Sequence, residues 1–242
     1  MANTLETRSA YIREFAANVS HEFKTPLTSI QGAVELLRDH AASMDEDRRA
    51  RFLDNIAKDS DRLARLVTRL LELARADVMQ PGGAGESQLG ALLLDLQRHY
   101  ADLGQSFGIE GADNDIGGGG EDDIRVAMDG DNLASVVRNL LDNALHHGKG
   151  EPRLIIEPET AQVRLRVIDD GPGVSPANAD RIFSAFFTTD REGGGTGLGL
   201  ALVKTLVEVH SGQIRLADRA EGCEFVVTLP RLNGPAAGDA AS

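Results

Sequence analysis

The chain has 242 residues, of which 41% are hydrophobic, and a formal net charge of −13. That length fits one large domain or two small ones, and the apolar fraction is sufficient for a buried core. The charge is uneven, because residues 1–78 hold 12 basic and 13 acidic residues and the remainder holds 13 and 25. An acidic second half argues against nucleic acid or an anionic membrane as a partner, but it permits a small anionic ligand that arrives with a cation.

The targeting and cysteine signals are sparse. No apolar run approaches the length of about 18 residues that a membrane-spanning helix needs, and the N-terminus has no basic-then-apolar signal peptide. Cys223 is the only cysteine, which excludes an intramolecular disulfide and a cysteine-based metal cluster. We therefore expect the chain as given to be cytoplasmic and any metal ion to be held by oxygen.

Residues 1–79 predict a helical hairpin. Apolar residues recur at spacings of three and four over residues 5–39, and a heptad pattern runs from Leu53 to Ala74, so each stretch predicts a long amphipathic helix. A short polar loop at 40–45 makes the two helices antiparallel neighbours. Because one hairpin has too small a core to be stable alone, we expect a homodimer in which two hairpins form a four-helix bundle.

Residues 80–87, QPGGAGES, predict a flexible linker. Beyond the linker the pattern changes to short strands and two helices, which makes the second half α+β or mixed α/β. The expected strands lie at 124–128, 153–157, 162–169, 213–216 and 224–229, and the expected helices at 131–147 and 199–210. Residues 114–123 predict an exposed loop, and residues 233–242 a disordered tail.

The helix at 131–147 carries a polar face. Asn139 and Asn143 are one turn apart, with His146 on the same side. The opposite face is apolar and consists of Leu133, Val137, Leu140, Leu141 and Ala144. An ordinary amphipathic helix accounts for this pattern, so the two amides indicate a site only in combination with other motifs.

Two glycine motifs follow. In VIDDGPGV, residues 167–174, a strand ends at Asp169 and is followed by Gly171 and Gly173, which fits either a plain turn or backbone that approaches a flat base. In the second motif, Gly195 to Gly199 lead directly into a helix. Glycine-rich backbone at a helix N-terminus presents N–H groups to phosphate oxygens. It is not a P-loop, because no lysine and serine follow the last glycine.

In the first helix, the stretch HEFKTP occupies residues 21–26. His21 falls between two apolar positions, so its imidazole should point into solvent, where an inert surface histidine would also fit. Pro26 removes a backbone N–H and clashes with the carbonyl of Glu22, which predicts a bend beside His21.

Together these segments resemble the sensor histidine kinases of two-component signalling, from about residue 10 to 231. HEFKTP matches the family's H-box, Asn139 and Asn143 its N-box, 169–173 and 195–199 its glycine boxes, and 183–187 its F-box. The resemblance implies an α+β fold class in which a dimeric four-helix bundle precedes an α/β sandwich of the GHKL or Bergerat type. The implied domains are a dimerisation and phosphotransfer hairpin at 1–79, a linker at 80–87, an ATP-binding domain at 88–232 and a tail at 233–242.

The resemblance also implies ATP and Mg²⁺ as cofactors. Asp169 would accept a hydrogen bond from the exocyclic N–H of adenine, and Asn139 and Asn143 would offer oxygens to Mg²⁺. Further nucleotide contacts are implied for Gly171, Gly173, Gly195, Thr196, Gly197, Leu198 and Gly199. Residues 174–195 would form a mobile lid over ATP, with Phe183 and Phe186 either in the core or docking the lid.

One departure from the family concerns the end of the N-box helix. Many members have lysine or arginine followed by tyrosine where this chain has His146 and His147. Histidine is only partly charged at neutral pH, so either a histidine or Lys149 would contact phosphate, and a purely structural role is the alternative for His146.

By the resemblance, His21 is the phosphoacceptor, Glu22 is its general base, and Thr25 takes part in dephosphorylating the partner. The expected function is ATP-dependent autophosphorylation of His21 and phosphotransfer to an aspartate of a response regulator. The expected setting is the cytoplasmic part of a longer receptor, with membrane contact only through segments absent here. The alternatives are a conformational ATPase, which would lack the H-box hairpin, and a non-catalytic scaffold, against which the intact site residues argue.

Overall fold

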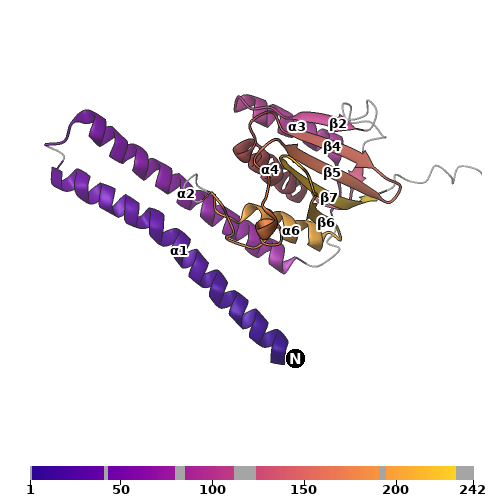
Figure 1. The fold of residues 1–242 in the computed structure, drawn as a ribbon, viewed down its shortest axis with the longest axis horizontal. Coiled ribbons are helices and arrows are strands. Elements are labelled where there is room, and N and C mark those ends of the chain that lie inside the picture. Colours follow the sequence, from indigo (N-terminus) through magenta and orange to yellow (C-terminus); the bar gives the residue numbers. More distant parts are fainter. Residues whose placement is uncertain (1, 41–42, 80–84, 112–123, 191–194, 233–242) are drawn as a thin grey trace, which may run out of the picture. The chain divides into compact units, whose positions relative to one another are not determined.

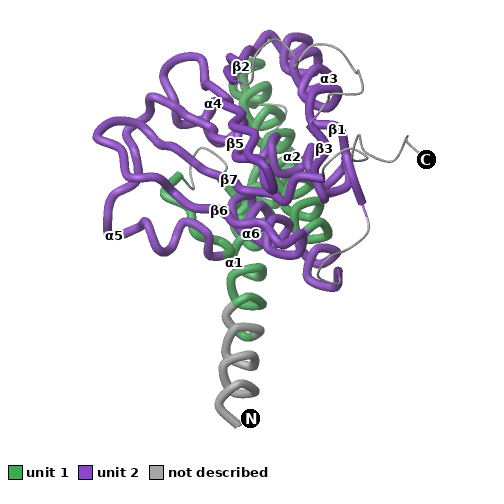
Figure 2. The backbone as a smooth tube through the Cα atoms, turned by 90° about the vertical axis from the view of Figure 1, so that its right-hand side faces the viewer, with its two compact units in different colours: residues 1–72, 185–198 green, residues 73–184, 199–242 purple. Residues whose placement is uncertain are grey.

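A computed structural model describes residues 2–40, 43–79, 85–111, 124–190 and 195–232. They fall into two compact units, one of residues 1–72 and 185–198 and the other of residues 73–184 and 199–242 (Figure 2). The predicted loop at 114–123, the predicted tail and most of the predicted linker, residues 80–84, lie outside the described residues. No helix in the described ranges has the length and apolar character of a membrane span.

The predicted hairpin is confirmed. Helix α1 spans Ala2–His40 and helix α2 spans Glu46–Val78 (Figure 1). Asp45 precedes α2, and its Oδ1 accepts a hydrogen bond from the backbone N–H of Arg48 at 2.7 Å, which satisfies a donor that the helix cannot satisfy itself. Pro26 is buried and lies inside α1 without ending it.

One apolar stripe of the hairpin faces solvent in the single chain. Ala33 and Leu66 are buried, whereas several large apolar side chains of the first unit are at least 40% exposed. They are Leu27, Val34, Leu36, Leu53, Val67 and Leu71. Leu53 and Val67 belong to the predicted heptad, so part of the expected core lacks cover within one copy.

The second unit is built on a seven-stranded mixed sheet with the order β1-β3-β7-β5-β4-β2 and with β6 paired to β7. Its strands are β1 Ser87–Gln88, β2 Gly108–Gly111, β3 Arg125–Val126, β4 Arg153–Pro158, β5 Gln162–Asp169, β6 Gln213–Leu216 and β7 Cys223–Leu232. Its helices are α3 Leu89–Asp102, α4 Gly130–His147, α5 Pro176–Ala179 and α6 Gly199–Val209. Among the described strands, β2 and β4 alone pair in parallel. The sequence analysis assigned no element to β1, β2, α3 or α5.

The period-two pattern of β5 explains the layering of this unit. Val163, Leu165 and Val167 are buried, whereas the intervening Arg164 and Arg166 are half-buried. Alternate side chains of a strand point to opposite faces, so one face of the sheet is apolar and the other charged. Helices α3, α4 and α6 lie on one side of the sheet (Figure 1). The predicted apolar face of α4 is buried throughout.

Capping fixes α4 at both ends. Asp129 is its N-cap, and its Oδ1 accepts from the N–H of Asn132 at 3.0 Å. At the C-terminal end, the N–H of Gly148 donates to the carbonyl of Ala144 at 2.8 Å. Between the caps, the Tyr100 hydroxyl of α3 bonds to Asp142 at 2.6 Å. The helix that carries the two asparagines is therefore held rigidly.

Candidate functional site: a histidine on the hairpin and a polar cluster in the sheet domain

His21 lies on the solvent-facing side of α1, as its position between apolar residues predicted. Its side chain is 68% exposed, and the nearest carboxylate is that of Glu22, with Nδ1 3.9 Å from Oε1. This separation is longer than a hydrogen bond. The imidazole is therefore accessible to a reactant and lies within reach of a base after a small rotation.

Glu22 is buried, with its side chain only 8% exposed, and its Oε2 accepts a hydrogen bond from Nη2 of Arg62 on α2 at 3.1 Å. Arg62 was not predicted from the sequence. It is one of several arginines on α2, and no local signal distinguishes it, because the residue it binds is 40 positions away.

Thr25 follows His21 by one turn on the exposed face of α1. Its hydroxyl lies 3.4 Å from the carbonyl oxygen of His21, which is long for an O–H···O hydrogen bond. The hydroxyl is therefore accessible on the face of the helix that presents the imidazole.

Asp169 ends β5 in a buried position that leaves one oxygen without a partner. Oδ1 accepts hydrogen bonds from the backbone N–H groups of Gly171 at 2.8 Å and Cys223 at 3.3 Å. Oδ2 is buried, and nothing in the described part of the chain donates to it. A buried acceptor without a donor is unfavourable, so this oxygen fits a ligand that brings an N–H group. Gly173 lies two residues beyond the Gly171 donor in the turn that follows the strand.

Asn139 is buried and faces the start of α6. Its amide nitrogen donates to the carbonyl of Ser135 at 2.7 Å, which leaves Oδ1 as the group that faces Gly199. A Cβ atom at Gly199 would lie only 2.9 Å from that oxygen, so a larger residue at position 199 would displace the Asn139 amide. Asn143 is half-buried one turn farther along α4. The helix thus offers two amide side chains beside the N-terminus of α6.

The loop after α4 is tied to the end of β5. Asp170 Oδ1 accepts from the backbone N–H groups of Lys149 at 2.6 Å and Gly150 at 3.0 Å. These bonds, led by that from Lys149, lower the pKa of Asp170 below its ordinary value. His146 is exposed and His147 half-buried, with ring centroids 4.8 Å apart. The structure thus places both histidines and Lys149 near the strand end that carries Asp169.

The second glycine motif is divided between the two units. Gly199 belongs to the sheet unit, whereas Gly195, Thr196, Gly197 and Leu198 belong to the other. Within this segment Gly197 has φ of +65°, and its carbonyl accepts from the N–H of Phe186 at 2.8 Å. Thr196 Oγ1 lies 3.4 Å from the N–H of Leu198. Residues 191–194 of the predicted lid lie outside the described residues.

The two phenylalanines of the F-box have different surroundings. The ring of Phe183 packs edge-on against Phe225 of β7, with centroids 6.3 Å apart, which favours a role in the core of the sheet unit. Phe186 is buried and has a positive φ of 65°, an uncommon conformation for a non-glycine residue.

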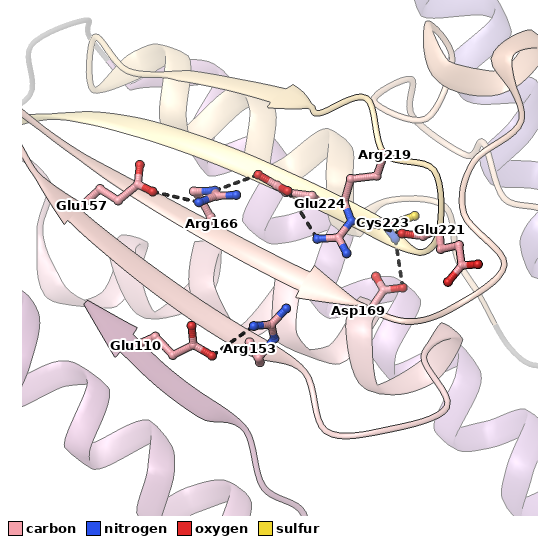
Figure 3. A network of polar contacts seen from close by, with 9 residues as sticks. All are labelled: Glu110, Arg153, Glu157, Arg166, Asp169, Arg219, Glu221, Cys223 and Glu224. Atoms are coloured by element: carbon pink, nitrogen blue, oxygen red, sulfur yellow. Dashed lines mark hydrogen bonds and ion pairs between the residues drawn. The ribbon is translucent and has the colours of Figure 1, made fainter.

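A row of charged residues lies beside Asp169 on the sheet face (Figure 3). Arg166 donates to Glu224 at 2.7 Å and to Glu157 at 2.8 Å, and these bonds lower the pKa of both carboxyls. Next to Glu224, burial and the nearby Asp169 raise the pKa of the Cys223 thiol to about 11. Strand β5, which carries Asp169, is therefore joined to β7 by the ion pair of Arg166 with Glu224, and the thiol of Cys223 on β7 is protonated at neutral pH.

Comparison with known proteins accounts for both halves. Residues 11–78 match the family model of the His Kinase A (phospho-acceptor) domain, and residues 128–233 match that of the histidine kinase-, DNA gyrase B-, and HSP90-like ATPase. The chain is 34% identical over 229 residues to the probable sensor histidine kinase TcrY of Mycobacterium tuberculosis. The chain belongs to the sensor histidine kinase family. The match to TcrY covers 90% of this chain and 46% of TcrY.

A second curated histidine kinase matches the chain with similar identity and coverage. The sensor protein kinase WalK of Staphylococcus aureus is 32% identical over 232 residues, which cover 90% of this chain and 53% of that WalK sequence. The chain thus spans about half the length of the curated relatives it matches.

Solved structures of histidine kinases share the fold. ThkA in complex with the response regulator protein TrrA is 25% identical, with a TM-score of 0.73, and the match covers 94% of this chain and 64% of that one. Full-length ShkA in complex with AMPPNP is 26% identical, with a TM-score of 0.60, covering 92% and 47%. These likenesses support an α+β fold class, in which a helical hairpin is followed by an α/β sheet domain.

Proposed function

We propose that this chain transfers the γ-phosphoryl group of ATP to His21 and then to an aspartate of a response regulator. The observation that carries the proposal is the exposed imidazole of His21 directly beside the buried carboxylate of Glu22. A nucleophile must reach a substrate on another domain, whereas its base must keep a fixed place. The relatives named as sensor histidine kinases support the same activity.

The surroundings of Asp169 in the sheet domain support ATP as the phosphoryl donor. Asp169 Oδ2 is an acceptor whose donor is missing from the described chain, and the exocyclic amine of adenine supplies such an N–H. Guanine presents a carbonyl oxygen at the equivalent place, which would face a carboxylate oxygen and be repelled. Asp169 therefore selects adenine over guanine, and Gly171 and Gly173 complete the turn beside it.

Asn139 and Asn143 fit a magnesium ion, because Mg²⁺ takes oxygen ligands and the Oδ1 of Asn139 is turned away from its own helix bond. When bound, the ion neutralises charge on the triphosphate. Gly195, Thr196, Gly197, Leu198 and Gly199 would offer backbone N–H groups to the phosphates. His146, His147 and Lys149 are the nearby residues that would add positive charge, and the tie between Asp170 and Lys149 limits where that charge can lie.

We infer two partners for the hairpin, a second copy of this chain and a response regulator. The exposed apolar residues of α1 and α2 would be covered in a four-helix bundle formed with a second copy. A response regulator is proposed because ThkA, whose fold this chain shares, was solved with one. Thr25 lies one turn from His21 on the exposed face, so we also propose that its hydroxyl orients a water molecule that dephosphorylates the regulator.

The test is incubation with γ-labelled ATP and Mg²⁺, followed by acid or base treatment. A phosphoramidate on His21 is expected to be acid-labile and base-stable. The variant His21→Gln should lose the label, and His40→Gln, at another exposed histidine of α1, should keep it. Both variants should bind ATP as the wild type does. Label that survives in His21→Gln would place the phosphoacceptor elsewhere, and a wild type that binds ATP but never becomes labelled would favour a scaffold.

A further inference from the structure

The ion pair between Glu22 and Arg62 joins the two helices of the hairpin next to the phosphoacceptor. Nη2 of Arg62 lies 3.1 Å from Oε2 of Glu22, and the two side chains are 17% and 8% exposed. Arg65, three positions farther along α2, is exposed to solvent. The burial of Arg62 therefore distinguishes it from its neighbour and is associated with its contact to Glu22.

A buried carboxylate is stabilised by such a partner. Moving a charge out of water is unfavourable, and removal of one member of a buried pair leaves an uncompensated charge. The guanidinium of Arg62 therefore fixes the position of the Glu22 carboxylate at a depth where solvent contributes little.

The two carboxylate oxygens face different groups. Oε2 accepts from Arg62, whereas Oε1 is the oxygen nearest to the imidazole, at 3.9 Å from Nδ1 of His21. A hydrogen bond between Nδ1 and Oε1 needs an approach of roughly 1 Å. The exposed imidazole can make that movement because it is not packed, while the carboxylate, fixed by Arg62, stays in place. The geometry thus separates a fixed base from a mobile nucleophile.

We propose that Arg62 is a positioning residue for phosphorylation of His21, acting through Glu22. This inference rests on the proposed function. In the step, Nε2 of His21 forms a bond to the γ-phosphorus, the bond from that phosphorus to the bridging oxygen breaks, and ADP leaves with the electron pair. The proton on Nδ1 passes to Oε1 of Glu22. Arg62 touches neither ATP nor His21 in this scheme, and it holds the proton acceptor in its orientation.

The experiment compares Arg62→Met and Arg62→Gln with Arg65→Met in the full chain, measuring the rate of His21 phosphorylation over a range of ATP concentrations. Glutamine keeps a hydrogen-bond donor and lacks the charge, so it serves if the methionine variant fails to fold. We expect both Arg62 variants to lower the rate at saturating ATP tenfold to a hundredfold, with KM for ATP changed by less than about twofold, in line with partial loss of a general base. Arg65→Met should behave as wild type.

Two further variants separate positioning from a purely structural effect. Arg62→Lys restores the charge and should be faster than Arg62→Gln. In the background of Glu22→Gln, replacing Arg62 should cause no additional loss, because its action passes through the missing carboxylate. A wild-type or faster rate in Arg62→Gln would overturn the proposal, and so would a full additional loss in the double variant. If the wild type itself forms no phosphohistidine, the proposed function fails instead.

Discussion

Asp169 and Cys223 are register partners on β5 and β7, and the backbone N–H of Cys223 donates to Oδ1 of Asp169 at 3.3 Å. Together with the bond from Gly171, this contact occupies one oxygen of the carboxylate and directs the other toward a ligand. In the proposed ATP site, recognition of the base would depend on one atom, Oδ2, for which no described residue supplies a donor.

Replacement of Asp169 by asparagine tests this dependence. The amide keeps an oxygen for the two backbone donors and therefore presents its NH₂ group where Oδ2 was. Two donors then face each other in the ATP complex, and the affinity for ATP should fall roughly 10- to 100-fold, as expected for loss of a buried hydrogen bond to a charged group. Calorimetric titration measures the affinity. Asp102→Asn, at an exposed position at the end of α3, is the control, and equal affinities in the two variants would remove the adenine assignment.

Gly199→Ala tests the role of Asn139. The added Cβ would lie 2.9 Å from Oδ1 of Asn139, so the amide has to leave its bond with Ser135. We expect the affinity for ATP with Mg²⁺ to fall about tenfold, equivalent to about 1.4 kcal/mol, and the difference from wild type to shrink when Mg²⁺ is chelated. Gly130→Ala places its Cβ 4.0 Å from the Cβ of Ser87, an ordinary van der Waals distance, and should bind normally. A loss that is independent of Mg²⁺ would contradict a role for Asn139 in holding the cation.

The single cysteine provides a test that needs no substitution. Since burial and Asp169 raise the pKa of the Cys223 thiol from 9.0 to about 11, the thiolate population falls roughly 100-fold at neutral pH. Alkylation by iodoacetamide, followed by intact mass, should therefore be at least about 100-fold slower in the folded protein than in urea. Between pH 7 and 9 the folded rate should rise about tenfold per pH unit. Equal rates in the folded and unfolded states would show that the thiol is neither buried nor shifted.

Arg166 should control how the sheet domain responds to acid. Its hydrogen bond depresses the pKa of Glu224 below 4.5, so the pair stabilises the fold above the unfolded pKa, and that contribution is lost as the pH falls through the folded pKa. At pH 7, Arg166→Met should lower the stability of the β5 and β7 region by about 1 to 3 kcal/mol. Below pH 4.5 the difference should diminish.

Hydrogen exchange of peptides from β5 and β7, read by mass spectrometry, reports this region separately from the hairpin. Arg153→Met is the matched control, because Arg153 and Glu110 form a more exposed pair on the same sheet, and such pairs contribute less than about 1 kcal/mol. If protection in Arg166→Met equals that in Arg153→Met at pH 7, the buried network does not stabilise the strand pair.

Thr25→Ala should separate the two reactions of the hairpin. The change removes an exposed hydroxyl whose nearest recorded contact is 3.4 Å long, so α1 should be unaffected. Phosphorylation of His21 and transfer to the regulator should stay within about twofold of wild type, whereas decay of the phosphorylated regulator with added ADP should slow at least tenfold, the scale of a lost catalytic group. Equal decay rates would leave Thr25 as a surface residue, and a matching loss of phosphorylation would indicate a disturbed helix.

The sequence by itself determined the elements whose periodicity is strong. The two hairpin helices and the helix at 131–147 were predicted because their apolar faces repeat over several turns, and β5 has the predicted bounds 162–169. Helix α3 was not assigned. Its first half, LGALLLDL, is almost continuously apolar, a pattern that fits a buried strand or a buried helix equally well. Packing decides between them, including the bond from Tyr100 to Asp142 on α4.

For the candidate site, the residues could be predicted from the sequence, but their contacts could not. His21, Asn139, Asn143 and Asp169 could be selected from sequence, because short motifs fix their neighbours in the chain. Their chemical surroundings could not, because each depends on a residue brought from far away: Arg62 to Glu22 across 40 positions, and Cys223 to Asp169 across 54. Only the tertiary structure shows which arginine binds the carboxylate of Glu22 and which oxygen of Asp169 has no donor among the described residues, since hydrogen bonds and burial are set by position in space.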